Sequence, residues 1–332
     1  MTSLTRSPHR PNRFTAGACQ LAGVVLLCLL LTDINAKELT QIRHYDKGYS
    51  PHLRVYLTDV LQLVLDKTTP TYGPYDLKYY SQNLSANRSK LETERGELID
   101  ILFSTHWRGH FVNPKNVTQI DYPILYGMLG LRSLIISKDN TRAFEGIQSE
   151  NQFLHFSAGQ GSSWTDIGIL QANNIEVVEA EFFDGLFPML EKRRFDYLPL
   201  SILEAQTALQ AKGVQYNNLT MAENINVFYP MPFYLYVNKG RPILAERLKI
   251  GLEIATADGS IERLFQRHFY YLDQLLKSND HKLMVLNNPF LTPEHNAQEL
   301  HMLLESNPNI FQVLHYFSSA STLLLQRYAY SQ

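Results

Sequence analysis

Cysteine is almost missing from this chain of 332 residues. Its two cysteines, Cys19 and Cys28, both lie within the first 36 residues, so the remainder has no internal disulfide bond. A chain of this size without disulfides must be held together by a hydrophobic core. An excess of charge of one sign is also missing, because 30 basic and 32 acidic side chains nearly cancel. This balance excludes the basic surface expected of a nucleic-acid-binding protein.

Residues 1–36 have the pattern of a secretory signal peptide. Three arginines precede an apolar run at 16–31, and Ala36 supplies a small residue before a predicted cleavage site. The run is shorter than the ~20 residues that a transmembrane helix needs. We therefore expect cleavage after Ala36 and a periplasmic protein, with an uncleaved N-terminal anchor as the alternative. Without this segment, 27 basic and 31 acidic side chains remain, a net charge of about −4.

Catalytic motifs are also missing. The chain has no HExxH pair, no Gly-x-Ser-x-Gly elbow and no glycine-rich phosphate loop. His106 and His110 have a metal-like spacing, but no further ligands accompany them. We therefore expect no metal, no cofactor and no enzymatic activity.

Two rounds of alternating strands and helices are predicted after residue 37. Strands at 38–45, 75–80 and 98–105 alternate with helical patterns, and strands at 153–157, 175–180 and 195–200 do the same after a connector at 121–138. Such alternation favours parallel sheets. A second apolar run at 227–238 is interpreted as the return crossing, and helices are predicted at 243–255 and 260–269. The fold class is therefore α/β, with two parallel-rich sheets joined by a two-strand hinge.

Five segments carry a resemblance to a known family. In their order and spacing they resemble the type II periplasmic solute-binding proteins, in the amino-acid-binding (family 3) branch of ABC transporter receptors. The resemblance covers roughly residues 38–275. The segments are 45–51, IDILFSTHWR at 99–108, YPILYG at 122–127, GQGSSWTD at 159–166 and KRRFDYLPLS at 192–201.

The resemblance implies a domain organisation and a function. It implies one lobe at 37–125 plus 229–275, a second lobe at 126–228, and a C-terminal helical extension at 276–332. The implied function is capture of a small, carboxylate-bearing ligand, such as an amino acid, between the lobes for ABC-type import. The implied partner is an inner-membrane permease, and we expect a monomer. A ligand-sensing subunit for a membrane sensor and a dehydratase-type enzyme on the same fold are the alternatives.

Candidate ligand-binding residues of the first lobe follow its predicted strands. Arg108 follows a buried strand and Thr105, and the resemblance implies that this arginine clamps a carboxylate. A surface arginine in a polar loop is the alternative. The aromatic residues Tyr45, Tyr49 and Trp107 could stack on a ligand, although aromatic side chains more often belong to a core.

Candidate residues of the second lobe lie in a Gly/Ser-rich turn before a predicted helix. Ser162, Ser163, Trp164 and Thr165 could bind an anion with hydroxyl and N–H groups, although simple helix capping would also account for the serines. Amino-acid binders of the family place a carboxylate for the ligand's ammonium group after the position of Asp196. The nearest one here is Glu204, which departs from the family's spacing.

The C-terminal extension has an amphipathic pattern. Pro293 opens a helical stretch in which Leu300, Leu303 and Leu304 share one face. We expect this face to pack against the back of the first lobe, with docking on a partner protein as the alternative.

Overall fold

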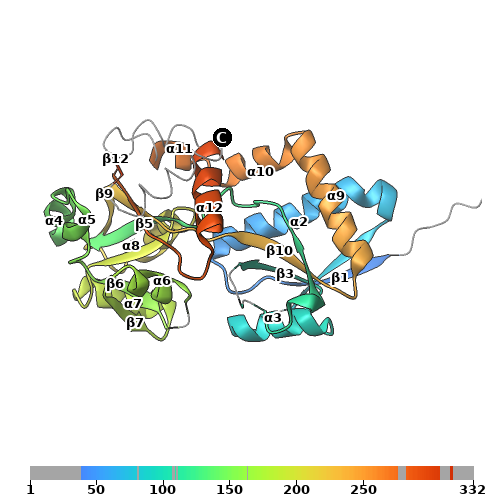
Figure 1. Ribbon diagram of the computed structural model, residues 1–332, viewed down its shortest axis with the longest axis horizontal. Helices are drawn as coiled ribbons and strands as arrows, with labels where there is room; N and C mark the ends of the chain where they lie inside the picture. The colour runs from blue at the N-terminus through green and yellow to red at the C-terminus, as the bar shows by residue number, and fades with distance from the viewer. Residues whose placement is uncertain are drawn as a thin grey trace, which may run out of the picture.

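The computed structural model describes residues 39–80, 82–106, 109, 111–162, 164–275, 282–306 and 315–316. These residues form two lobes, each built on one mixed β-sheet with helices packed around it (Figure 1). The predicted α/β class with two lobes is confirmed. The predicted signal peptide lies outside the described residues, and within them no helix is both long and apolar enough to cross a bilayer.

The sheet of the first lobe contains the strands predicted before the connector. Strand β1 pairs in parallel with both β2 and β3, as the alternation of strands and helices predicts. Strand β10 pairs antiparallel with β3 and β4, so the sheet is mixed. In sheet order the strands are β2 (Tyr75–Tyr80), β1 (Thr40–Tyr45), β3 (Ile101–Thr105), β10 (Phe233–Asn238) and β4 (Val117–Ile120).

The sheet of the second lobe repeats this order and extends it. Its strands β7, β6, β8, β5 and β9 correspond in order to those of the first sheet, and β5 is antiparallel to both of its neighbours. Beyond β9 the sheet continues with β11 and β12. The bounds are β5 (Leu131–Ser137), β6 (Ala158–Gly161), β7 (Val177–Ala180), β8 (Tyr197–Ser201), β9 (Leu219–Phe228), β11 (Lys282–Val285) and β12 (His315–Tyr316).

The antiparallel strand of each sheet is the strand that follows a crossing between the lobes. Residues 121–130 lead from β4 into β5, and residues 229–232 lead from β9 into β10. Each crossing therefore enters the interior of the other lobe's sheet. A rotation of one lobe against the other must change the backbone of these two segments, which together form the hinge.

Local capping signals account for where the main helices begin and end. Helix α2 begins after Ser50, whose Oγ accepts a hydrogen bond from the Leu53 backbone N–H at 3.3 Å, and Pro51 is its first residue. Figure 1 shows α2 and α9 on one side of the first sheet and α3 on the other. The helices of the first lobe are α2 (Pro51–Tyr72), α3 (Ala86–Arg95), α9 (Pro242–Ala257) and α10 (Ser260–His268), with a 3-10 turn at Pro114–Asn116. The short α11 (Leu272–Leu275) lies over the second lobe (Figure 1).

The second lobe has shorter helices. They are α4 (Thr141–Glu145), α5 (Glu150–Phe153), α6 (Asp166–Ala172), α7 (Phe183–Glu191) and α8 (Ala205–Gly213), with a 3-10 turn at Lys138–Asn140. The strand predicted at 153–157 is wrong, because Ser149 caps a helical turn there and the strand β6 begins only at Ala158. The apolar residues of this stretch, Phe153, Leu154 and Phe156, pack against the core from a helical turn and the residues after it rather than from an extended chain.

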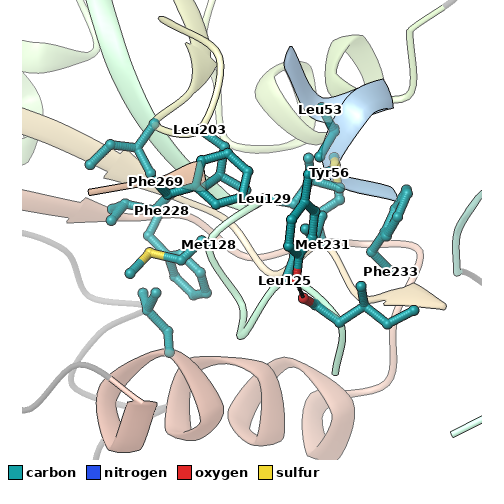
Figure 2. Close-up of a cluster of buried hydrophobic side chains, with 14 of the residues drawn as sticks. Leu53, Tyr56, Leu125, Met128, Leu129, Leu203, Phe228, Met231, Phe233 and Phe269 are labelled. Atoms are coloured by element: carbon teal, nitrogen blue, oxygen red, sulfur yellow. Dashed lines mark hydrogen bonds between the residues drawn. The ribbon is translucent and has the colours of Figure 1, made fainter. Parts of the chain in front are cut away.

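A continuous hydrophobic core extends through the hinge. The crossing residues Leu125, Met128, Leu129 and Met231 are all buried. Figure 2 shows them packed between α2 of the first lobe, which contributes Leu53 and Tyr56, and the second-lobe residues Leu203 and Phe228. The hydroxyl of Tyr56 also donates a hydrogen bond to the carbonyl of Ile124 in the first crossing, at 2.8 Å. The hinge is therefore a packed region with its own core contacts.

The described part of the C-terminal extension packs on the hinge and on the second lobe. Strand β11 pairs in parallel with β9, and helix α12 (Pro293–Ser306) lies between the two lobes (Figure 1). Leu300, Leu303 and Leu304 are buried in the same core as the crossings. The apolar face was thus identified correctly from its spacing, but its location at the hinge differs from the expected position behind the first lobe.

Candidate functional site

A cleft of about 1060 Å³ opens between the two lobes. Its first-lobe wall comes from the segment after β1, the start of α2, the start of α3 and the end of β3. Its second-lobe wall comes from the beginnings of α6, α7 and α8, and the crossing residues Leu129 and Met231 lie at its base. The volume is at the upper end of the roughly 300–1,000 Å³ common for small-ligand sites.

Tyrosine and lysine side chains shape the first-lobe wall. The hydroxyl of Tyr49 donates a hydrogen bond to the carbonyl of Phe103, and burial raises the pKa of this hydroxyl. The hydroxyl of Tyr45 donates to the carbonyl of Leu84 at 3.1 Å and accepts from its N–H at 3.0 Å. Burial lowers the pKa of Lys90, on α3, to about 8. These bonds fix the orientation of two rings beside a cationic side chain.

Trp164 and Phe183 form an aromatic part of the second-lobe wall. Their ring centroids are 6.0 Å apart and the rings are tilted by 32°. A Cβ atom on Gly161 would lie 2.8 Å from the Trp164 indole, so only glycine allows the indole to pack over this position. Thr165 also lines the cleft, next to the start of α6. This wall can contact an apolar or planar part of a ligand.

A buried ion pair, which the sequence analysis did not identify, lies at the base of the cleft. Arg132 on β5 is 6 % exposed, and its Nη2 lies 3.1 Å from Oδ1 of Asp166. The Tyr229 hydroxyl donates to the same oxygen at 2.6 Å, and the Arg132 guanidinium carbon lies 4.7 Å from the centre of the Tyr229 ring. Burial opposes the charge on Arg132, whereas Asp166 favours it, and the net effect raises the pKa of Arg132.

Glu204 joins the two walls. It lies directly before α8 in the second lobe, and its Oε1 accepts a hydrogen bond at 3.2 Å from the backbone N–H of Ser50, the residue that caps α2 in the first lobe. A carboxylate is favoured at this position because backbone N–H groups at a helix N-terminus carry partial positive charge.

Charges on the two walls are unequal. The charged residues that line the first-lobe wall are Lys47 and Lys90, both cationic, and Lys90 already has an interaction partner within the protein. On the second-lobe wall Arg132 pairs with Asp166, and Lys212 pairs with Asp184 at 2.7 Å, which leaves Glu204 as the surplus charge. Over the described residues, one wall is therefore cationic and the opposite wall has a net negative charge.

Six of the ten predicted site residues line the cleft. Ser162 does not, and its hydroxyl donates instead to the carbonyl of Ala180 on β7 at 3.1 Å. Trp107, Arg108 and Ser163 lie outside the residues that the structure describes, so their roles stay predictions. The residues that line the cleft are Tyr45, Tyr49, Thr105, Trp164, Thr165 and Glu204.

Arg132 could have been found from one signal in the sequence. It is the single charged residue in the apolar run LRSLIIS, and such residues are rarely buried without a specific partner. Its partner Asp166 follows 34 positions later in the glycine-rich turn, and no spacing rule connects the two. Among the described residues, no group of three or more acidic, histidine or cysteine side chains could hold a metal ion.

Comparisons with known proteins support the fold. No protein-family model matches the chain, and no curated protein matches it. Among solved structures, an ancestral arginine-binding protein bound to arginine has a TM-score of 0.50 at 15% identity, and the match covers 69% of this chain and 98% of that one. An ancestral arginine-binding protein bound to glutamine has a TM-score of 0.51 at 15% identity, and the match covers 70% of this chain and 99% of that one.

A third similar structure also contains an amino acid. The GluR0 ligand-binding core in complex with L-glutamate has a TM-score of 0.52 at 13% identity, and the match covers 69% of this chain and 97% of that one. At these identities the likeness establishes the fold alone. The chain therefore has the same two-lobed α/β fold as these three structures.

Proposed function

We propose that the protein is an exported solute-binding protein that captures a small zwitterionic ligand, an amino acid or a related compound, in the cleft between its lobes. The ligand's carboxylate faces the first-lobe wall with Lys47 and Lys90, together with Arg108 as predicted from the sequence. Its ammonium group faces Glu204, and its side chain contacts the aromatic wall at Trp164 and Phe183.

The opposite charge of the two walls is the observation that carries this proposal. A ligand with one acidic and one basic group satisfies both walls at once, and it draws the lobes together as it does so. The similar structures contain arginine, glutamine or L-glutamate as bound ligands, and each of these is a zwitterion.

The cellular role that we propose is delivery to an ABC-type permease in the inner membrane. The pattern of residues 1–36 supports export to the periplasm. The reaction is reversible binding without turnover, because no catalytic motif is present in the sequence.

A ligand screen tests the proposal. Thermal unfolding of the protein with each of the common amino acids, small peptides and organic acids at millimolar concentration should give a raised midpoint for at least one zwitterion. Calorimetry then measures the affinity of each hit. Stabilisation by simple organic acids but by no ammonium-bearing compound would contradict the role given to Glu204.

A sensing role is the second candidate. The similar structures leave about 30% of this chain without a counterpart, and part of that surplus packs on the hinge, where it could report closure to a membrane partner. Deleting the gene in its host separates the two roles. Loss of ligand uptake supports import, whereas unchanged uptake with a lost response to the ligand supports sensing.

A further inference from the structure

The C-terminal segment 282–306 connects the two lobes in addition to the two crossings. On the second lobe, β11 extends the sheet beside β9. Asn287 and Asn173, at the end of α6, exchange two hydrogen bonds: the Asn287 N–H donates to Asn173 Oδ1 at 3.1 Å, and Asn173 Nδ2 donates to the Asn287 carbonyl at 2.8 Å. The segment is thus anchored on the second lobe before α12 begins.

Both crossings are in contact with this segment. The side chain of Asn288 donates to the carbonyl of Pro230 in the second crossing at 2.8 Å. A Cβ atom on Gly127, in the first crossing, would lie 3.1 Å from the backbone of Leu303, so α12 packs directly against that chain. A change in either crossing must therefore alter its contact with α12.

Glu299 is the unusual residue of this contact. It is 4 % exposed and lines a small cavity of about 10 Å³, enough for roughly one water molecule, together with Tyr126 of the first crossing and Tyr234 of the first lobe. Within the described part of the chain its carboxylate accepts no hydrogen bond and has no cationic partner. Burying such a group in its charged form is costly.

Among the residues that the structure describes, the groups around Glu299 do not supply a compensating charge. Tyr234 and Tyr126 face it, and burial raises the pKa of both hydroxyls, so they stay neutral. Asp121 near Tyr234 adds negative charge. His106 and His295 lie near one another, and burial lowers the pKa of His106. Burial accordingly raises the pKa of Glu299 to about 7.

We propose that segment 282–306 is a strap that restricts rotation of the lobes, and that protonation of Glu299 controls how firmly the strap is docked. With a neutral carboxyl group α12 packs on the hinge and the lobes stay at the separation seen here. With a charged carboxylate α12 leaves the hinge more often and the lobes rotate more freely. This regulation rests on the proposed function, because ligand-driven closure is the motion that the strap would restrict.

The direction of the pH dependence follows from the two protonation states. The pKa of the carboxyl group is about 7 when α12 is docked, and its ordinary value is 4.5. Between these values the docked form binds more protons than the released form, so rising pH favours release. The docking equilibrium constant should fall about tenfold for each pH unit in this range and level off above pH 7.

Hydrogen exchange of α12 tests the role of Glu299. After correction for intrinsic rates, amide protection in 293–306 should fall by about tenfold per unit between pH 5 and 7 in the wild type. The amide protection of 293–306 should stay constant over this pH range in Glu299→Gln. Glu305→Gln removes an exposed carboxylate from the same helix and should behave as the wild type. A constant protection in the wild type, or an unchanged pH dependence in Glu299→Gln, would overturn the role of Glu299.

An inter-lobe distance measurement tests the strap itself. Spin labels at Asn87→Cys on α3 and Gln210→Cys on α8, both exposed, report the separation of the lobes, with Cys19 and Cys28 replaced by serine. We expect a narrow distance distribution at pH 5, a broader one at pH 8, and a broad one at both pH values in Asn288→Ala. If the distance distribution stays narrow in Asn288→Ala although hydrogen exchange shows that α12 is released in this variant, the proposal of a strap is overturned. Neither measurement uses a ligand, so failure here is distinguishable from failure of the proposed function.

Discussion

Glu204 and Ser50 lie 154 positions apart in the sequence, yet the carboxylate of the first accepts a hydrogen bond from the backbone N–H of the second at 3.2 Å. The bond crosses the cleft, and each residue lies at the start of a helix, α8 in the second lobe and α2 in the first. Within the described part of the chain, one oxygen of the Glu204 carboxylate has this partner and the other accepts no hydrogen bond, so the second oxygen is available to a ligand that enters between the lobes.

Glu204→Gln should weaken binding of an ammonium-bearing ligand. The amide keeps an acceptor for the Ser50 N–H but removes the charge, so the fold should be unaffected. Hydrogen bonds to charged groups contribute on the order of 1.5–3 kcal/mol, which corresponds to a loss of roughly ten- to hundredfold in affinity. Calorimetry with the best ligand of the screen measures this. Glu223→Gln, on an exposed position of β9, is the matched control, and an equal loss in both variants would refute the assignment.

Arg132→Met should destabilise the protein more than the double variant Arg132→Met/Asp166→Leu. The single change leaves Asp166 buried without its cationic partner, at a cost of roughly 3–5 kcal/mol, whereas the double change removes both charges. Urea unfolding of the wild type and of the single and double variants gives the coupling energy of the pair. A single variant as stable as the wild type would mean that the pair contributes nothing to the fold.

His44 should make the protein less stable in mild acid. It is buried on β1, and burial lowers its pKa from 6.5 to about 4. Between these values the unfolded chain binds a proton that the folded chain does not, so stability falls as the pH drops. The integrated effect is about 3 kcal/mol. In urea unfolding from pH 7 to 4, His44→Leu should lose this slope, while the same change at the exposed His155 should retain it. An unchanged slope in His44→Leu would assign the acid sensitivity to other groups.

The elements that local sequence patterns define were the ones predicted correctly. Strands β1 and β3 and helix α2 follow from apolar spacing, and the amphipathic face of α12 follows from Leu300, Leu303 and Leu304. The pairing of Arg132 with Asp166 and the contact between Glu204 and Ser50 depend on long-range folding. No local pattern encodes those distances, so six of the residues that line the cleft could be named from the sequence but its charged base could not.

The C-terminal segment shows the same difference between local patterns, which the sequence reveals, and long-range contacts, which it does not. Its apolar stripe predicts that it is buried, but only the sheet order reveals that β11 pairs with β9 and thereby places α12 at the hinge.

Truncation after Asp273 should lower the melting temperature by several degrees or cause aggregation, because it uncovers the edge of β9 and the apolar side of both crossings. Differential scanning fluorimetry and light scattering check this. A shortened protein of equal stability would show that these contacts are dispensable.

The central claim is that a ligand binds in the cleft and closes the lobes on it. Distances between spin labels at Asn87→Cys and Gln210→Cys, measured with and without the ligand that calorimetry identifies, test this claim most directly. We predict that the main distance becomes shorter and its distribution narrower when the site is saturated, because opposite charges on the two walls are then bridged. A distribution that does not change at saturation would contradict capture between closing lobes.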